Sequence, residues 1–338
     1  MANAPIVGRL PAGPRNAMTD VAGVTVGHCT LADGACQTGA TVIRPHAGNV
    51  YTDKVPAAAT VFNGFGKSIG LVQVDELGVL ETPIALTNTF SVGALAQAQI
   101  RHAIAENPEI GRKWPTVNPL VFECNDGYLN DIQAMAVQGQ HYDAALAAAG
   151  LDVAQGAIGA GRGMSSFGAK GGIGTASRMA GAYTVGALVL SNFGTAESLI
   201  LAGRPLGAAL DARLKQLAEP EKGSIIMIVA TDAPLDARQL RRLSMRAGTG
   251  LARTGSIYGH GSGDIALAFS TAYTVPHLAD APMPAVPMVH ESKLDPVFRA
   301  AADCVEQAIV HALWHAETVQ GRDGHTRRAL RELLQDLL

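Results

Sequence analysis

The feature that most constrains the fold is an uninterrupted apolar run that begins directly after Ser224 and ends at Thr231. A run of this length, bounded by polar residues, predicts a buried β-strand. Gly223 stands immediately before the serine, and a polar loop rich in Pro, Glu and Lys stands before the glycine. The chain must therefore place Ser224 at the first position of a buried strand, directly after a flexible glycine and an exposed loop.

Composition limits the kind of protein that carries this strand. The chain has 338 residues, of which 48% are hydrophobic, which is enough for one large core or two closely packed ones. Its net charge of −3 gives no surface for a polyanion, so we expect no nucleic-acid partner. The four cysteines form no CxxC pair, so we expect no metal site and a reducing compartment. With neither a secretory signal nor a membrane span recognisable, the sequence predicts a soluble, cytoplasmic protein. We also expect no cofactor.

Strand and helix patterns alternate along the chain, which predicts a mixed α/β fold without a clear domain boundary. We expect the helix after Thr231 to be capped by Asp232, with Pro234 in its first turn. The expected strands are 21–31, 41–44, 71–80, 82–86, 120–122, 183–190, 224–231 and 264–273, and the expected helices are 91–106, 129–138, 143–149, 234–253 and one that starts at 295.

Ser224 is a candidate nucleophile if the chain cuts itself between Gly223 and Ser224. A serine hydroxyl is a weak nucleophile unless a neighbouring base accepts its proton. The sequence around Ser224 contains neither a GxSxG nor an SxxK motif that supplies one. Cleavage would give Ser224 a free α-amine, and an α-amine with a pKa of about 7.7–8 can act as a base near neutral pH. The alternative interpretation of this stretch alone is that Ser224 only begins a strand.

Two further polar groups lie beside predicted buried strands. Ser262-Gly263-Asp264 enters an apolar strand, so a hydroxyl and a carboxylate can approach a neighbouring backbone there. Asn192 follows another strand, and its amide can donate to an oxyanion. Each group also has a simpler interpretation, because serine, aspartate and asparagine commonly stabilise turns.

A third group follows the short apolar strand 120–122. Glu123, Asp126 and Tyr128 cluster there, and polar residues at the end of a buried strand often form a site on a rigid support. A carboxylate can bind a substrate ammonium group, and a phenol can donate to a carbonyl. An Asx-type turn with an inward-facing tyrosine explains the same pattern.

Two other motifs do not support a site. The segment 163–170 differs from a phosphate-binding loop, because Ala169 separates Gly168 from Lys170. His311 and His315 share a helix face but lack the glutamate of an HExxH motif and a third ligand. We therefore expect neither a nucleotide site nor a metal site.

Taken together, these residues resemble the self-processing L-aminopeptidase/D-amino-acid esterases and β-aminopeptidases. The resemblance covers nearly the whole chain and keeps its motifs in one order. Its most specific part is Gly223-Ser224 with 225–235, followed by Ser262-Gly263-Asp264. The other matching segments are 16–24, 86–89, 91–93, 123–131, 170–175, 191–194 and 321–325.

The resemblance implies an α/β, four-layer αββα sandwich that is similar to N-terminal nucleophile hydrolases but has different connectivity. It implies one domain, 1–338, that cleaves itself into an α chain, 1–223, and a β chain, 224–338. Some members carry glutamate where this chain has the shorter Asp264. The roles implied are the nucleophile for Ser224, its supporting serine and acid for Ser262 and Asp264, the oxyanion donor for Asn192, the active-site tyrosine for Tyr128 and, by analogy and charge, the ammonium anchor for Glu123.

The implied activity is that of an aminopeptidase that releases N-terminal amino acids from short peptides, amides or esters through an acyl-enzyme. The resemblance also implies a homo-oligomer of four αβ heterodimers. Related self-cleaving hydrolases leave open an amidase of ω-amino-acid oligomers. Ornithine acetyltransferases share the layered fold but use threonine, so Ser224 argues against that alternative. An inactive scaffold is the non-enzyme alternative, and the joint presence of Gly223-Ser224, Ser262 and Asn192 argues against it.

Overall fold

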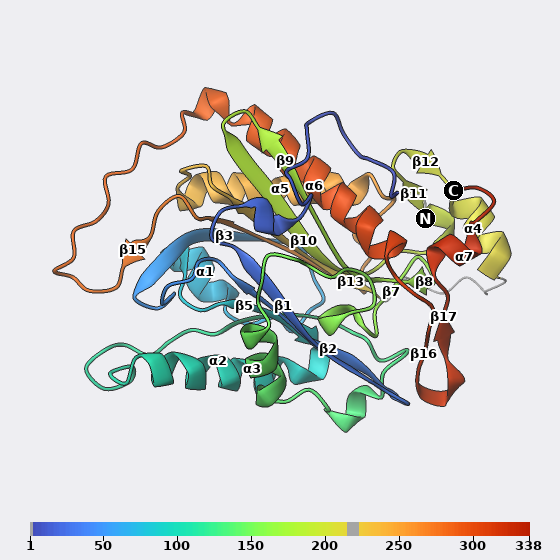
Figure 1. Ribbon diagram of the computed structural model, residues 1–338, viewed down its shortest axis with the longest axis horizontal. Helices are drawn as coiled ribbons and strands as arrows, with labels where there is room; N and C mark the ends of the chain where they lie inside the picture. Colours follow the sequence, from blue (N-terminus) through green and yellow to red (C-terminus); the bar gives the residue numbers. More distant parts are fainter. Residues whose placement is uncertain (1–2, 215–222) are drawn as a thin grey trace.

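Two β-sheets lie face to face at the centre of the computed structural model, which describes residues 3–214 and 223–338 (Figure 1). The smaller sheet has four strands in the order β1-β2-β5-β6. Its pairings are antiparallel β1 with β2, antiparallel β2 with β5 and parallel β5 with β6. The bounds of these strands are β1 (Thr25–Asp33), β2 (Cys36–Arg44), β5 (Ile84–Asn88) and β6 (Leu120–Cys124).

The larger sheet has seven strands, with β15-β3-β14-β13-β10-β9 in order and β4 beside β3. At its centre, β13 runs parallel to β14 on one side and antiparallel to β10 on the other. The predicted strand at 224–231 is this central strand. The bounds are β3 (Asp53–Gly64), β4 (Val79–Leu80), β9 (Gly172–Ala180), β10 (Tyr183–Asn192), β13 (Ser224–Thr231), β14 (Gly263–Ser270) and β15 (Val275–Pro276).

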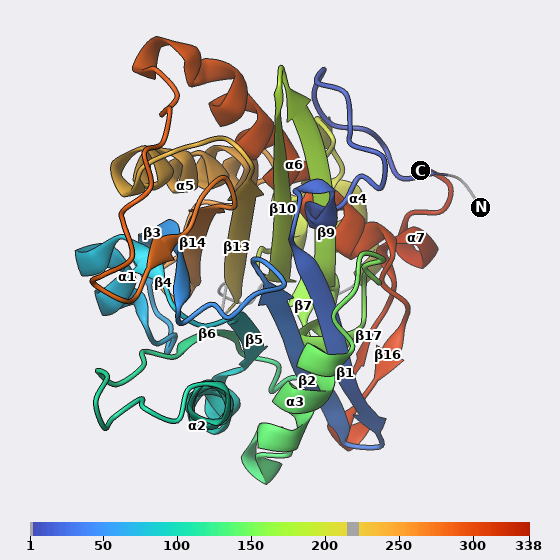
Figure 2. The same cartoon turned by 60° about the vertical axis from the view of Figure 1, so that its left-hand side comes forward.

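Helices cover the outer face of each sheet (Figure 2). Helices α2 (Val92–Glu106) and α3 (Gly139–Ala147) pack on the smaller sheet, and α5 (Ala237–Ala252) and α6 (Asp295–Trp314) pack on the larger one. The remaining helices are α1 (Leu71–Leu77), α4 (Gly207–Leu214) and α7 (Leu330–Leu333), and the short strands are β7 (Ser165–Ser166), β8 (Ala169–Lys170), β11 (Ile200–Leu201), β12 (Arg204–Pro205), β16 (Val319–Gln320) and β17 (Thr326–Arg327).

The apolar residues of β13 explain why this strand lies at the centre. Side chains alternate between the two faces of a strand. Ile225, Met227 and Val229 pack in the core beneath α5 and α6, whereas Ile226 and Ile228 pack in the core between the two sheets. All of these side chains are buried. Both faces of the strand must therefore be covered, which an αββα arrangement achieves.

Two of the predicted elements and one predicted helix cap are wrong. Of the predicted strand 71–80, residues 71–77 form helix α1 and only 79–80 form a strand, because Gly70 and Gly78 both adopt left-handed conformations that delimit a helical segment. Only Val74 of that helix is buried. The other residues that suggested a strand therefore lie at least partly exposed on the surface. The segment 129–138 contains only a 3-10 turn, since Met135 adopts a left-handed conformation that ends it.

The third error concerns the start of α5. Asp232 does not cap this helix, because its carboxylate accepts the backbone N–H of Thr184 at 2.7 Å. The cap is Asp236, which accepts from the backbone N–H of Gln239 at 2.7 Å in a capping box. The exposed loop predicted before Gly223 lies outside the described residues. Among the residues that are described, no helix is both long and apolar enough to cross a bilayer.

A matched pair of glycines tests how closely the layers pack. A Cβ at Gly174 on β9 would lie 1.9 Å from the carbonyl oxygen of Ala308 in α6, whereas a Cβ at Gly93 in α2 would meet no atom within 4 Å. We expect Gly174→Ala to lower the free energy of unfolding by about 1–3 kcal/mol through overpacking. Gly93→Ala should raise it by about 0.4–1 kcal/mol, because alanine restricts the unfolded chain. Urea denaturation measures both changes, and equal effects of the two substitutions would contradict the packing described here.

Candidate active site

The register of three strands brings the predicted nucleophile together with its partners. Ser224, at the start of β13, lies opposite Asn192 at the end of β10. On the other side, Ile225 pairs with Asp264, near the start of β14. At one end of the larger sheet, the starts of β13 and β14 therefore lie beside the end of β10.

The Ser224 hydroxyl is held by the backbone of its parallel neighbour. Its Oγ atom accepts the backbone N–H of Gly263 at 3.1 Å, and the residue is 6% exposed. A Cβ at Gly263 would lie 2.7 Å from the carbonyl oxygen of Phe65 and 3.2 Å from Ser224 Oγ. Only glycine fits this approach without displacing the hydroxyl. This backbone donor was not anticipated from the sequence.

Ser262 and Asp264 form a hydrogen-bonded pair beside Ser224. The Ser262 hydroxyl donates to Asp264 Oδ1 at 2.8 Å, and both side chains are fully buried. The shorter aspartate thus reaches the serine without a glutamate's extra methylene. With its proton directed at the carboxylate, the Ser262 oxygen is left with lone pairs that can accept a proton from another group.

Asn192 is anchored at both ends of its amide. Its Oδ1 accepts the backbone N–H of Ser165 at 2.8 Å, and its Nδ2 donates to the carbonyl of Asn125 at 3.0 Å. These two partners define which end of the amide is oxygen. Among the described residues only Asn125 uses an Nδ2 hydrogen, so the second hydrogen can serve an additional acceptor. The amide is therefore oriented before any substrate binds.

Glu123 comes from the smaller sheet and is nearly buried, with an exposed fraction of 3%. Its Oε1 accepts the backbone N–H of Lys67 at 2.7 Å, and its Oε2 accepts the hydroxyl of Thr89. A Cβ at Gly66 would lie 3.4 Å from Glu123 Oε1 and 3.9 Å from the Cα of Gly263. The carboxylate and the Ser224 hydroxyl therefore lie on either side of two closely packed glycines.

Neither oxygen of Glu123 contacts a cationic side chain within the described part of the chain. Lys67, the nearest lysine in that turn, directs its Nζ over the Phe65 ring at 4.5 Å. Buried carboxylates are normally paired with a cation or a metal. This carboxylate can accept a cation from outside the chain. Thr89 was missed because the motif 87–89 looks like a helix cap, a role that Asn88 performs.

Tyr128 is placed differently from the other candidates. Its ring is 38% exposed, stacks on His325 with the centroids 4.6 Å apart, and lies 3.6 Å from the Arg327 guanidinium. These contacts pack the ring against the β16–β17 hairpin. Arg327 in turn donates from Nε to the Ser165 hydroxyl at 3.1 Å, so Tyr128 is linked to the Asn192 anchor through two side chains. Its direct catalytic role stays a prediction.

Lys170 and His311 have structural partners. The Lys170 ammonium is fully buried and donates to the carbonyls of Gly161, Met164 and Gly171 at 2.7–2.9 Å. Burial lowers the pKa of Lys170 well below its usual range. His311 Nδ1 bonds to the carbonyl of Thr175 at 2.7 Å, and burial lowers its pKa to about 4. Nowhere in residues 3–214 and 223–338 do three potential metal ligands come together.

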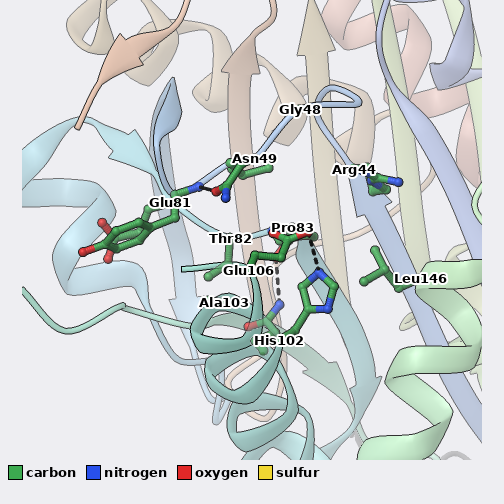
Figure 3. A pocket seen from close by; sticks show the side chains of 13 residues that line it. Arg44, Gly48, Asn49, Glu81, Thr82, Pro83, His102, Ala103, Glu106 and Leu146 are labelled. Carbon is green, nitrogen blue, oxygen red and sulfur yellow. Dashed lines mark hydrogen bonds and ion pairs between the residues drawn. The ribbon is translucent and has the colours of Figure 1, made fainter. Parts of the chain in front are cut away.

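A separate polar cavity lies between α2 and the smaller sheet (Figure 3). Its volume is about 20 Å³, enough for one water molecule. Glu81 and His102 line it, but Glu81 already pairs with Lys54 at 2.8 Å and His102 contacts Glu106 at 3.5 Å. The lining contains none of the candidate catalytic residues, so this cavity does not compete with the Ser224 site.

Comparisons with known proteins identify the family of this chain. Residues 16–327 match peptidase family S58. The chain belongs to this family. The β-peptidyl aminopeptidase BapA of Sphingosinicella xenopeptidilytica is 38% identical over 335 residues, covering 91% of this chain and 83% of that protein. Membership in family S58 confirms the predicted resemblance and identifies the chain as a hydrolase.

Two solved structures confirm the fold of this S58 peptidase. A protein from Pyrococcus horikoshii OT3 is 48% identical, with a TM-score of 0.91 over 97% of this chain and 95% of that chain. The L-aminopeptidase D-Ala-esterase/amidase of Ochrobactrum anthropi is 35% identical, with a TM-score of 0.89 over 98% and 96% of the two chains. The latter is described as a variant of the N-terminal nucleophile hydrolase fold. The predicted fold class is therefore confirmed.

Asp126, in the loop after Glu123, makes the stability of the folded protein depend on pH in a testable way. Its carboxyl is fully buried, and Oδ1 accepts from the Asn130 amide at 3.1 Å. Burial raises the pKa of Asp126 from 3.8 to about 6. The folded protein thus holds this proton more tightly than the unfolded chain does. The resulting stabilisation, roughly 3 kcal/mol, is present below about pH 4 and is lost as the pH rises through 6.

We expect Asp126→Asn to remove this component, because asparagine keeps the shape of the neutral carboxyl. Urea unfolding between pH 4.5 and 7.5 should show a smaller decline in stability for the variant than for the wild type. Asp131→Asn removes an exposed carboxyl nearby and should leave the decline unchanged. A decline in Asp126→Asn equal to that of the wild type would show that Asp126 does not bind the proton.

Proposed function

We propose that this S58 peptidase cleaves its own chain between Gly223 and Ser224 and then acts as a serine aminopeptidase. The observation that carries the proposal is the convergence of Ser224, the Ser262–Asp264 pair and Asn192 at one sheet edge. A Cβ at Gly223 would lie 1.9 Å from the carbonyl oxygen of Asn192, so a glycine is required immediately before the nucleophile.

In self-cleavage, Ser224 Oγ attacks the Gly223 carbonyl carbon. Ser262, whose own proton is directed to Asp264, accepts the hydroxyl proton and passes it to the departing amide nitrogen. The C–N bond breaks, an ester links Gly223 to Ser224 Oγ, and the α-amine of Ser224 is released. Water then hydrolyses the ester, which yields the Gly223 carboxylate and restores the hydroxyl. The domain 1–338 becomes two chains, 1–223 and 224–338.

In peptide hydrolysis, the same hydroxyl attacks the substrate carbonyl. The new α-amine, with a pKa of about 7.7–8, takes the proton together with Ser262. The remaining N–H of Asn192 donates to the tetrahedral oxyanion, an interaction worth roughly 2.7–4 kcal/mol at comparable sites. The leaving amine receives the proton, and water hydrolyses the acyl-enzyme. No metal or cofactor takes part in these steps.

Glu123 supplies the preference for a free amino terminus. Its carboxylate is almost buried, and its two partners in the described part of the chain are neutral donors, so a substrate ammonium would provide the missing positive charge. This arrangement supports release of single N-terminal residues from short peptides, amides or esters. The similarity of this chain to BapA, a β-peptidyl aminopeptidase, supports the proposal that its substrates include peptides of β-amino acids.

We further propose a cytoplasmic location and an assembly of four αβ heterodimers. All four cysteines are free, which suits a reducing compartment. The assembly rests on the resemblance to the self-processing aminopeptidases alone.

Ser224→Ala tests both uses of the hydroxyl. The wild type should migrate as two bands under denaturing conditions, with the smaller beginning Ser-Ile-Ile-Met, and should hydrolyse an aminoacyl p-nitroanilide. The variant should migrate as one band and be inactive. Ser292→Ala, at an exposed serine, should behave as the wild type. An uncut wild type that hydrolyses the substrate, or an active Ser224→Ala variant, would refute the proposal.

Glu123→Gln tests recognition of the ammonium group. Glutamine keeps the volume of the side chain and an oxygen for the Lys67 N–H, but it removes the charge. We expect kcat/KM for an aminoacyl p-nitroanilide to fall about 10- to 100-fold, the range for a charge-assisted hydrogen bond. Activity on the N-acetylated substrate should change little, so selectivity for the free amine narrows. Glu76→Gln, at an exposed site, is the control. Unchanged selectivity in Glu123→Gln would exclude the anchor.

A further inference from the structure

We propose that Asn63 is a positioning residue, which holds the loop before β14 so that Ser262 and Gly263 meet the Ser224 hydroxyl. The inference rests on the proposed function of Ser224. Asn63 lies near the end of β3, and its side chain is half-buried. Nothing in its sequence context singles it out, because it precedes a Gly-Phe-Gly turn that explains an asparagine by itself.

The Asn63 amide contacts three carbonyls of a single loop. Its Nδ2 donates to the carbonyls of Gly259 at 3.0 Å and His260 at 3.2 Å, and to that of Ser262. The two hydrogens of an amide nitrogen are thus shared among three acceptors. The loop also bonds to itself, since the Ser262 N–H donates to the Gly259 carbonyl at 2.9 Å. One side chain therefore fixes the residues that lead directly to the catalytic turn.

A β-bulge aims Asn63 at this loop. Asp264 pairs with Asn63, but the next residue, Ile265, pairs with Val61, so Phe62 is the extra residue on β3. Bulges re-aim side chains and are common beside active sites. The extra residue is used as well, because the Phe62 ring stacks on Tyr258 with the centroids 5.4 Å apart. The Tyr258 hydroxyl donates to the Gly248 carbonyl at 2.7 Å, which ties the start of the loop to α5.

Two contacts to the reacting groups depend on the position of this loop. The Gly263 N–H donates to Ser224 Oγ, and the Ser262 hydroxyl donates to Asp264. Gly263 directly follows Ser262, whose carbonyl is bound by Asn63. A displaced loop would move both the proton acceptor and the donor that sets the Ser224 hydroxyl. Glu123 is held separately, by Thr89 and the Lys67 backbone.

This separation predicts a loss confined to the chemical step. Misplacing a catalytic group by about 1 Å can lower a rate about 100-fold. We expect Asn63→Ala and Asn63→Asp to slow self-cleavage and to lower kcat about 10- to 100-fold, with KM for an aminoacyl p-nitroanilide within about twofold of the wild type. Asn63→Asp has the same size as the wild type but presents acceptors instead of donors to the three carbonyls.

The experiment compares these variants with Val61→Ala, an exposed position on the same strand end. Self-cleavage is followed by the disappearance of the full-length band over time. Its rate can therefore be measured even in a variant that matures too slowly for a peptidase assay. Thermal unfolding monitors folding, and a melting temperature close to that of the wild type separates positioning from loss of structure. If Asn63→Ala does not fold, Asn63→Asp and Asn63→Ser provide the same comparison.

A normal rate of self-cleavage and a normal kcat in a folded Asn63 variant would overturn the inference while Ser224→Ala stays inactive. A rise in KM with unchanged kcat would overturn it too, because it would place Asn63 in substrate binding. If Ser224→Ala itself were active, the proposed function would fail first, and the positioning role would fall with it. A lowered kcat, slow self-cleavage and an unchanged KM would support the assignment.

Discussion

The site depends on the hydrogen-bond ladder that β13 shares with its two neighbours. A parallel pairing aligns the starts of β13 and β14, whereas the antiparallel pairing with β10 brings the end of that strand to the same edge. Ser224, Gly263 and Asn192 are thus neighbours because of backbone register, although they are far apart in sequence. A slip of one residue would turn each side chain to the opposite face. The alternating cores on the two faces of β13 prevent such a slip.

Packing between the two sheets positions Glu123, the fourth component of the site after Ser224, Gly263 and Asn192. Glu123 precedes Cys124, the last residue of β6, and the Cys124 thiol lies 3.6 Å from the Leu190 carbonyl in β10. The apolar packing between the sheets therefore places the Glu123 carboxylate near the end of the larger sheet at which Ser224 lies. Glycines make the final approach possible, because Gly66 and Gly263 leave no side chain between the acid and the hydroxyl.

The sequence predicted the parts of the site that depend on local pattern. A polar residue at the border of an apolar run is visible by itself, so Ser224, Asn192 and Asp264 were identifiable before their contacts were known. Contacts between segments were not, because they depend on register and on a bulge. Asn63 is the clearest example: its role appears only once Phe62 is the extra residue opposite β14. Tyr128 is the converse, since its ring packs against a hairpin formed almost 200 residues later in the chain.

Within residues 3–214 and 223–338, Glu123 has no cationic partner, and this feature connects the stability of the fold to the proposed activity. A buried carboxylate with only neutral donors loses part of its solvation energy, and the core must offset that cost. An internal lysine or arginine would restore the balance but would also occupy the place of a substrate ammonium. The well-packed sheets can accommodate this cost because burial on both faces of β13 contributes far more than one imperfectly solvated charge removes. The stability of the core thus permits a buried carboxylate with neutral donors near Ser224, and in the proposed function this carboxylate distinguishes a substrate with a free amine from one without it.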